Sequence, residues 1–323
     1  MGYYFCCFSF DICYLWVNEF TVLFPASLFL GIVAGLVPVA WGAFFADNTS
    51  PEDRGKIMGL SVAASMPIAY IFLVYKPIGE SMRALFIAIV SIYLLAMLAI
   101  NINFSGKTEN KRARRRGRVE IELNFFYYAA PIFLFYTVAG FLLSIGLPTI
   151  QSNISSGLFT IAWALPFFFG AVLGGVLLDG IGRKFPMIVG LAIIGVSLAM
   201  LGIVGTQLSF ISIVPLAIGS AIVSTSSFII WADLAPARAR AVHYGVGFSL
   251  MAIVLIVGLM GVDTVLGSVN PSQINLYLLI CSGAIFLCIP PLLQVEDALP
   301  KEIIEQRKMR QYLERAKRIY SKK

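Results

Sequence analysis

The stretch GGVLLDGIGRK (residues 174–184) places Asp179, Arg183 and Lys184 within six residues of a chain that otherwise avoids charge. Of its 323 residues, 59% are hydrophobic and 13% are charged, with a mean hydropathy of +0.87. A soluble domain has about 25% charged residues. Apolar runs long enough to cross ~30 Å of hydrocarbon as helices recur along the whole length. The alternating segments of about ten residues that build membrane β-barrels are absent. The composition therefore predicts an all-α, polytopic membrane protein.

Ten apolar stretches are predicted to be membrane spans. They are residues 2–17, 20–46, 56–75, 82–104, 125–147, 155–178, 185–205, 208–233, 241–262 and 273–294. Basic residues orient them, because cytoplasmic loops are enriched in Lys and Arg. All 24 Lys and Arg residues except Lys76 and Arg83 fall on one set of alternate connections and the C-terminal tail. We therefore expect a multi-pass protein of the cell membrane with both termini in the cytoplasm.

Two basic segments divide the chain further. Residues 105–124 contain the run KRARRRGR (111–118) between two spans, and residues 295–323 form a basic tail. A net charge of +7 could suggest nucleic-acid binding, but a basic run between spans is more typical of a linker on an anionic leaflet. Apolar residues at helical spacing predict that the tail is an amphipathic helix on the same leaflet, the alternative being a solvated charged helix. The predicted domains are thus 1–104, the linker, a six-helix bundle over 125–294, and the tail.

Two connections repeat one pattern, an aspartate followed by an arginine seven residues later and a glycine 12 residues later. The copies consist of Asp47, Arg54 and Gly59, and of Asp233, Arg240 and Gly245. They are 186 residues apart, on either side of the basic linker. Repeated bundles related by an axis along the membrane normal are a transporter architecture. The repeat therefore predicts two similar bundles.

The opening stretch resembles a loop motif of the major facilitator superfamily, G-x-L-x-D-x-x-G-R-[KR]. All six positions match, at Gly175, Leu177, Asp179, Gly182, Arg183 and Lys184. The residue types also suit a tight connection. A glycine allows close helix approach, the aspartate can cap a helix, and a second glycine permits a left-handed turn. The alternative is that these residues form only a cytoplasmic loop, enriched in basic residues, with a helix cap.

This resemblance implies two pseudo-symmetric helical bundles and secondary transport of a small organic solute by alternating access. It also implies that Asp179 and Arg183 form a latch that holds the cytoplasmic side closed. Asp233, Arg238 and Arg240, at the next cytoplasmic connection, are the expected partners.

The family has twelve helices and a second copy of the motif between helices 2 and 3. The repeat spacing places that copy just before Met1, so the first two helices are expected to be missing. Either the reading frame starts too late or the chain is a shortened paralogue. A shortened chain could be a non-transporting remnant or a membrane interaction protein.

The resemblance also suggests which residues face the solute. Three spans, 20–46, 125–147 and 208–233, correspond to helices that line the central cavity in the family. Their polar and aromatic candidates are Trp41, Tyr136, Thr137, Ser224, Thr225 and Ser226. The alternative is that these hydroxyls bond their own helix or a neighbouring one. Asp11, an acid within the first apolar stretch, is a weak candidate for proton coupling.

Other functions have less support in the sequence. The glycine-rich signature of drug/proton antiporters ends in Gly-Pro, whereas here Met66 precedes Pro67. The segment NINFSGKTENK (101–111) lacks the Pro-Glu-Ser motif of sugar porters. A single histidine and no H-E-x-x-H argue against a membrane enzyme. The five cysteines lie in apolar runs without metal-ligand spacing, so we expect no metal or cofactor.

Overall fold

The computed structural model describes residues 35–74, 123–143, 156–204, 209–236, 239–265 and 271–299, with six single residues between 303 and 313. Spans 2–17 and 82–104, the basic run, most of the tail, Asp11 and Arg238 lie outside the described residues. Residues 35–48 are helical. The further helices are α3 (Arg54–Val74), α5 (Leu123–Phe141), α7 (Ser156–Ile181), α8 (Lys184–Val204), α9 (Ser209–Leu234), α10 (Arg240–Val265), α11 (Pro271–Leu287) and α12 (Ile289–Gln294). The prediction of an all-α membrane protein is confirmed for this part of the chain.

Six described helical segments are long and apolar enough to cross a membrane. They are Asn124–Phe141, Ile161–Ile181, Lys184–Val204, Ile211–Leu234, Arg240–Gly258 and Gln273–Gln294. All six lie within the predicted bundle 125–294 or begin one residue before it. The total of ten spans includes stretches outside the described residues and stays a prediction.

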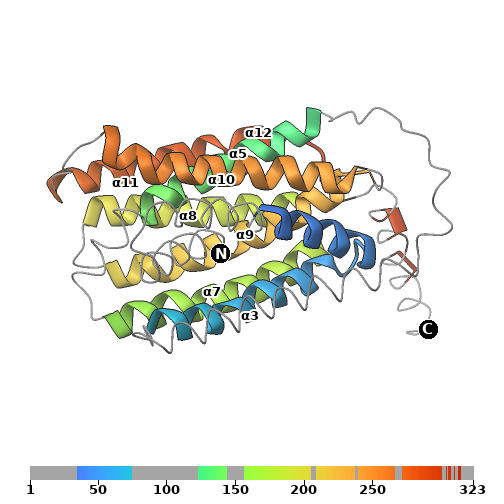
Figure 1. Cartoon of the computed structure of the whole chain (residues 1–323), viewed down its shortest axis with the longest axis horizontal. Helices are drawn as coiled ribbons and strands as arrows, with labels where there is room; N and C mark the ends of the chain where they lie inside the picture. The colour runs from blue at the N-terminus through green and yellow to red at the C-terminus, as the bar shows by residue number, and fades with distance from the viewer. Residues whose placement is uncertain are drawn as a thin grey trace, which may run out of the picture.

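The helices run roughly along the long axis of the molecule (Figure 1). Helix α7 packs between α3 and α9, α9 packs on α8, and α8 packs on α11, while α5 pairs with α10. Helix α3 comes from the N-terminal part of the chain, so its contact with α7 joins the two predicted halves. Large apolar side chains such as Leu173, Ile203 and Ile280 remain more than half exposed, as expected where lipid surrounds a helix.

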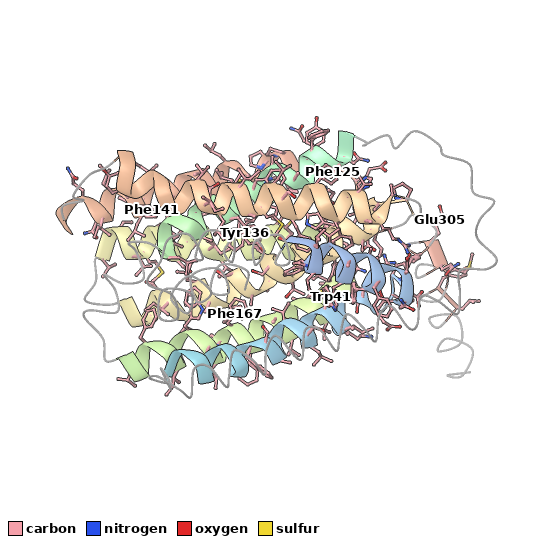
Figure 2. The ribbon with its side chains drawn as sticks, viewed as in Figure 1. Trp41, Phe125, Tyr136, Phe141, Phe167 and Glu305 are labelled. Carbon is pink, nitrogen blue, oxygen red and sulfur yellow. The ribbon has the colours of Figure 1, made fainter. Side chains whose placement is uncertain are left out.

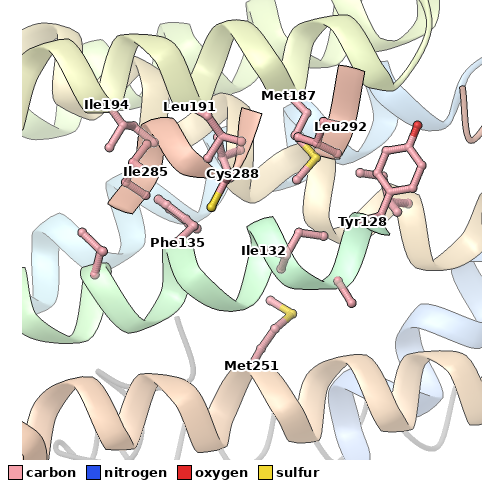
Figure 3. Packing of buried hydrophobic residues seen from close by; sticks show 14 of the residues in the cluster. Tyr128, Ile132, Phe135, Met187, Leu191, Ile194, Met251, Ile285, Cys288 and Leu292 are labelled. Atoms are coloured by element: carbon pink, nitrogen blue, oxygen red, sulfur yellow. The ribbon is translucent and has the colours of Figure 1, made fainter. Parts of the chain in front are cut away.

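The core of the C-terminal half lies between α5, α8 and the last two helices. Tyr128, Ile132 and Phe135 from α5 face Met187 and its neighbours on α8, and Met251 approaches from α10 (Figure 3). Aromatic side chains extend along α5 from Phe125 to Phe141 (Figure 2). Because lipid is as apolar as these residues, close van der Waals packing holds this core together more than exclusion from water does.

The last predicted span, 273–294, is divided in the structure. Helix α11 ends at Leu287, a turn follows at Cys288, and α12 begins at Ile289. Pro290 and Pro291 cause the break, because neither has an N–H to donate to the preceding turn. The end of α12 lies beside the start of α8, where Lys184 Nζ donates to the carbonyls of Leu293 and Val295.

Candidate functional site where three helix ends meet

Four charged side chains meet in the interior at one end of the bundle. Arg54 begins α3, Asp179 lies near the end of α7, Arg183 follows α7, and Asp233 lies near the end of α9. Their exposed fractions are 2% for Arg54, 6% for Asp179 and 0% for Arg183, and the side chain of Asp233 is also fully buried. Two arginines and two aspartates leave the cluster neutral, which limits the cost of removing them from water. We call these four residues the latch cluster.

Arg183 is the centre of the latch cluster. Its Nε donates to Asp233 Oδ2 at 2.7 Å, and its Nη1 donates to Asp179 Oδ1 at 2.9 Å. Nη1 also donates to the carbonyl of Leu178 at 2.6 Å, and Nη2 donates to the carbonyl of Pro51. A guanidinium has donors in fixed directions, and here they reach two carboxylates and two carbonyls at once.

Asp179 also caps a helix of the other half. Its two carboxylate oxygens accept hydrogen bonds from the backbone N–H groups of Gly55 at 2.7 Å and Lys56 at 2.8 Å. These amides lie in the first turn of α3, where N–H groups have no partner within the helix and the helix dipole favours negative charge. One side chain of the C-terminal half therefore completes a helix of the N-terminal half.

The two copies of the sequence repeat exchange partners across the halves. Arg54 of the first copy pairs with Asp233 of the second, and Arg240 of the second pairs with Asp47 of the first. The first pair is buried, whereas Asp47 and Arg240 lie at the periphery, with side chains 46% and 20% exposed. Arg54 is further held by the carbonyl of Ala46 at 2.7 Å.

Glycines allow α3 and α7 to cross closely beside the latch cluster. A Cβ on Gly55 would overlap the carbonyl oxygen of Gly175, and a Cβ on Gly175 would overlap that of Gly55. A Cβ on Gly59 would lie 2.5 Å from the carbonyl oxygen of Ala171. Gly245, in the second copy of the repeat, has its nearest neighbour at 3.9 Å and no comparable constraint.

The remaining motif residues shape the connection between α7 and α8. Gly182 has φ +115°, the left-handed region that favours glycine. Leu177 is half-buried on α7. Lys184 donates through Nζ to the carbonyls of Leu293 at 2.8 Å and Val295 at 2.7 Å, so this lysine caps the end of α12.

Sequence reasoning missed Asp297. Its carboxylate accepts hydrogen bonds from the backbone N–H groups of Arg183 and Lys184. Residues 295–299 belong to the segment expected to lie as a tail on the membrane, yet Val295 and Leu299 are buried against the bundle. An acid directly after the last apolar span was the available signal, because elsewhere that segment is mainly basic.

The predicted cavity residues differ in how their polar groups are used. The hydroxyls of Thr137, Thr225 and Ser226 each donate to a carbonyl one turn earlier in their own helix, at 2.7–3.0 Å. Tyr136 on α5 instead lies opposite Ser224 and Ser227 of α9. Trp41 stacks on Phe45 with ring centroids 5.4 Å apart and packs against a cluster containing Met58 and Leu178.

No cluster of three metal-ligating side chains occurs among the described residues. The geometry therefore shows a charge-mediated contact between helix ends in a multi-pass membrane protein.

A family model described as Major Facilitator Superfamily matches residues 2–259, about four fifths of the chain. The chain thus belongs to the Major Facilitator Superfamily, whose members are secondary transporters rather than enzymes, and the resemblance seen in the loop motif is confirmed. No curated protein is similar enough to this chain to match it.

Proposed function

We propose that this protein moves a small organic solute across the cytoplasmic membrane by alternating access, and that the latch cluster closes its cytoplasmic side. The observation that carries the proposal is the placement of the four charges. Asp179, Arg183 and Asp233 belong to the C-terminal half, and Arg54 and the capped amides of α3 belong to the N-terminal half.

The energetics suit a contact that must also open. A buried ion pair gains Coulomb energy but loses hydration, and the two terms often nearly cancel. In the closed state every charge in the latch cluster has a partner, and in an open state water can solvate each one. The cluster can therefore specify the closed geometry without making it too stable to leave.

The sidedness of the proposal rests on the basic residues. Arg54, Lys56, Arg183, Lys184 and Arg240 all lie at the end of the bundle that holds the latch cluster. By the positive-inside rule that end faces the cytoplasm. The described conformation, closed there, then corresponds to the outward-facing side of the transport cycle.

For the solute, we place most weight on Tyr136 and Ser224. Both are half-buried, and the Tyr136 side chain on α5 lies opposite Ser224 on α9. Such hydroxyls can exchange hydrogen bonds with a neutral or polar organic molecule. We further propose that protons or another coupling ion drive transport, and that the linker and tail contact the anionic inner leaflet.

The test is uptake into liposomes from a panel of organic solutes. Asp179→Asn keeps the shape of the side chain but removes its charge, and Asp179→Lys reverses the charge. Asp53→Asn is a matched control, because Asp53 is near the same helix start with a side chain 60% exposed. We expect both Asp179 variants to insert and to lose most uptake while Asp53→Asn retains it; uptake at the unaltered level by Asp179→Lys would contradict the proposal.

A further inference from the structure

The five residues after α12 form a strap across the start of α8. Residues 295–299, VEDAL, follow directly on α12, and within them Val295, Ala298 and Leu299 are 6%, 7% and 2% exposed. A short segment beyond a final helix gains order by being fixed at several points. Three sets of hydrogen bonds fix this one.

The first set runs from Asp297 to the connection between α7 and α8. Its carboxylate accepts from Arg183 N at 3.0 Å, from Lys184 N at 3.2 Å, and from Leu299 N at 2.9 Å within the strap. Asp297 therefore acts as the N-terminal cap of α8, supplied from elsewhere in the chain. It binds the backbone of Arg183, whose side chain is the centre of the latch cluster.

The second set runs in the opposite direction. Lys184 Nζ donates to the carbonyls of Leu293 and Val295. These carbonyls lie at the end of α12 and just after it, where a carbonyl has no N–H partner within the helix. The carboxylate of the strap thus caps α8, and the lysine of α8 caps α12. Gly182 takes part as well, because a Cβ there would overlap the carboxylate of Asp297.

The third set joins the strap to α5. The hydroxyl of Tyr128 donates to the carbonyl of Glu296 at 2.8 Å and accepts from the N–H of Ala298 at 3.1 Å. These two residues flank Asp297. Tyr128 is two turns of helix, about 12 Å, from Tyr136 on the same helix.

We propose that the strap links α5 to the latch cluster, with Asp297 and Tyr128 as positioning residues for Arg183. The inference rests on the proposed function of that cluster. A shift of α5 when a solute binds near Tyr136 moves Tyr128, and with it the residues on both sides of Asp297. Asp297 then shifts or releases the backbone of Arg183, and the guanidinium loses its alignment with Asp179 and Asp233.

The test measures how readily the two halves stay closed. Asp47→Cys and Arg240→Cys place thiols at the peripheral pair, in a background with the five native cysteines replaced by alanine. The rate of disulfide formation between the two introduced thiols reports the closed population. Tyr128→Phe removes one hydroxyl and keeps the ring, and Tyr127→Phe is its matched control because Tyr127 is the neighbouring residue and 37% exposed. Asp297→Asn tests the cap, with Glu305→Gln, an exposed acid of the tail, as its control.

We expect Tyr128→Phe and Asp297→Asn each to slow cross-linking about three- to tenfold, the effect of losing one or two hydrogen bonds. Since both act through one strap, the double variant should be little slower than Asp297→Asn alone. Amide exchange should accelerate at Arg183 and Lys184 in Asp297→Asn, without global loss of protection. Unchanged cross-linking in both strap variants, or fully additive effects, would overturn the proposal.

Asp233→Asn, measured in the same assay, separates the strap from the latch. If Asp233→Asn slows cross-linking and the strap variants do not, the proposed role of the strap is wrong and the proposed latch is supported. If Asp233→Asn also has no effect, the proposed latch is wrong and the strap proposal falls with it.

Discussion

Arg183 and Asp233 form an ion pair with 2.7 Å between Nε and Oδ2, although they are 50 residues apart in the sequence and both side chains are fully buried. Asp233 also binds Arg54, so a single carboxylate serves one arginine from each half of the protein. This sharing makes Asp233 the residue whose charge the latch cluster can least lose.

Replacing Asp233 by asparagine should leave two buried guanidinium groups with one carboxylate between them. Removing one partner of a buried pair costs about 3–5 kcal/mol, because the remaining charge is not compensated. We expect a clear fall in the thermal unfolding temperature of the purified protein in detergent. A double variant, Arg54→Gln with Asp233→Asn, restores neutrality and should recover part of the loss. Equal stability of the single variant and the unaltered protein would contradict the role given to this carboxylate.

The peripheral pair should behave differently. Asp47 and Arg240 are partly exposed to water, and such pairs contribute about 0–1 kcal/mol. Asp47→Asn should therefore change the unfolding temperature little, and exchange of the two charges in Asp47→Arg with Arg240→Asp should be tolerated. Measured in the same series, a loss as large as that of Asp233→Asn would show that the ranking of the two pairs is wrong.

The crossing of α3 and α7 should not tolerate a methyl group. A Cβ on Gly175 would overlap the carbonyl oxygen of Gly55, which is backbone and cannot rotate away. Gly175→Ala should force the helices apart and destabilise the closed state by about 1–3 kcal/mol, seen as slower cross-linking between positions 47 and 240.

Gly180 provides the matched control for that substitution. It lies on the same helix, and a Cβ there would meet nothing within 4 Å. Gly180→Ala should leave cross-linking unchanged or slightly faster, because alanine favours a helix by about 0.5–1 kcal/mol. A similar loss in both alanine variants would point to general helix damage rather than to the crossing.

Tyr136 should matter more for the solute than the hydroxyls that bond their own helix. Tyr136→Phe removes a hydroxyl that lies between α5 and α9, and we expect weaker uptake of whichever solute the panel identifies, chiefly through a raised KM. Ser226→Ala removes a hydroxyl that bonds the carbonyl of Ile222 and should leave KM within about twofold. A larger rise in KM for Ser226→Ala than for Tyr136→Phe would contradict this ranking and would indicate that the solute binds nearer to Ser226.

The sequence predicted the membrane class and the loop motif because both depend on local patterns. Apolar length identifies spans, and the six motif positions lie within ten residues. The repeat also placed Asp47, Arg54, Asp233 and Arg240 in one frame. The repeat could not predict that residues of one copy form ion pairs with residues of the other copy. Those pairs depend on how the two bundles face each other in space.

Asp297 shows the same limit. Its partners at the start of α8 are backbone amides more than a hundred residues earlier, and a backbone N–H has no sequence signature. The one-residue break at Cys288 does not change the prediction of a span over 273–294, because Gln273–Gln294 is still long and apolar enough to cross a membrane. The hydrogen-bond partners of the hydroxyls on α9 could not be predicted from the sequence either. A serine that bonds its own helix and one that contacts a solute look alike in sequence.

The most direct test of the central claim, that the latch cluster holds the two halves together, is a distance between the halves. Spin labels at Ile57 on α3 and Val242 on α10 occupy positions 42% and 46% exposed, clear of the buried contacts. In the unaltered protein, pulsed electron paramagnetic resonance should give mainly one short distance. In Asp179→Asn and Asp233→Asn a second, longer distance should become the major one. An identical distance distribution in all three proteins would contradict the account.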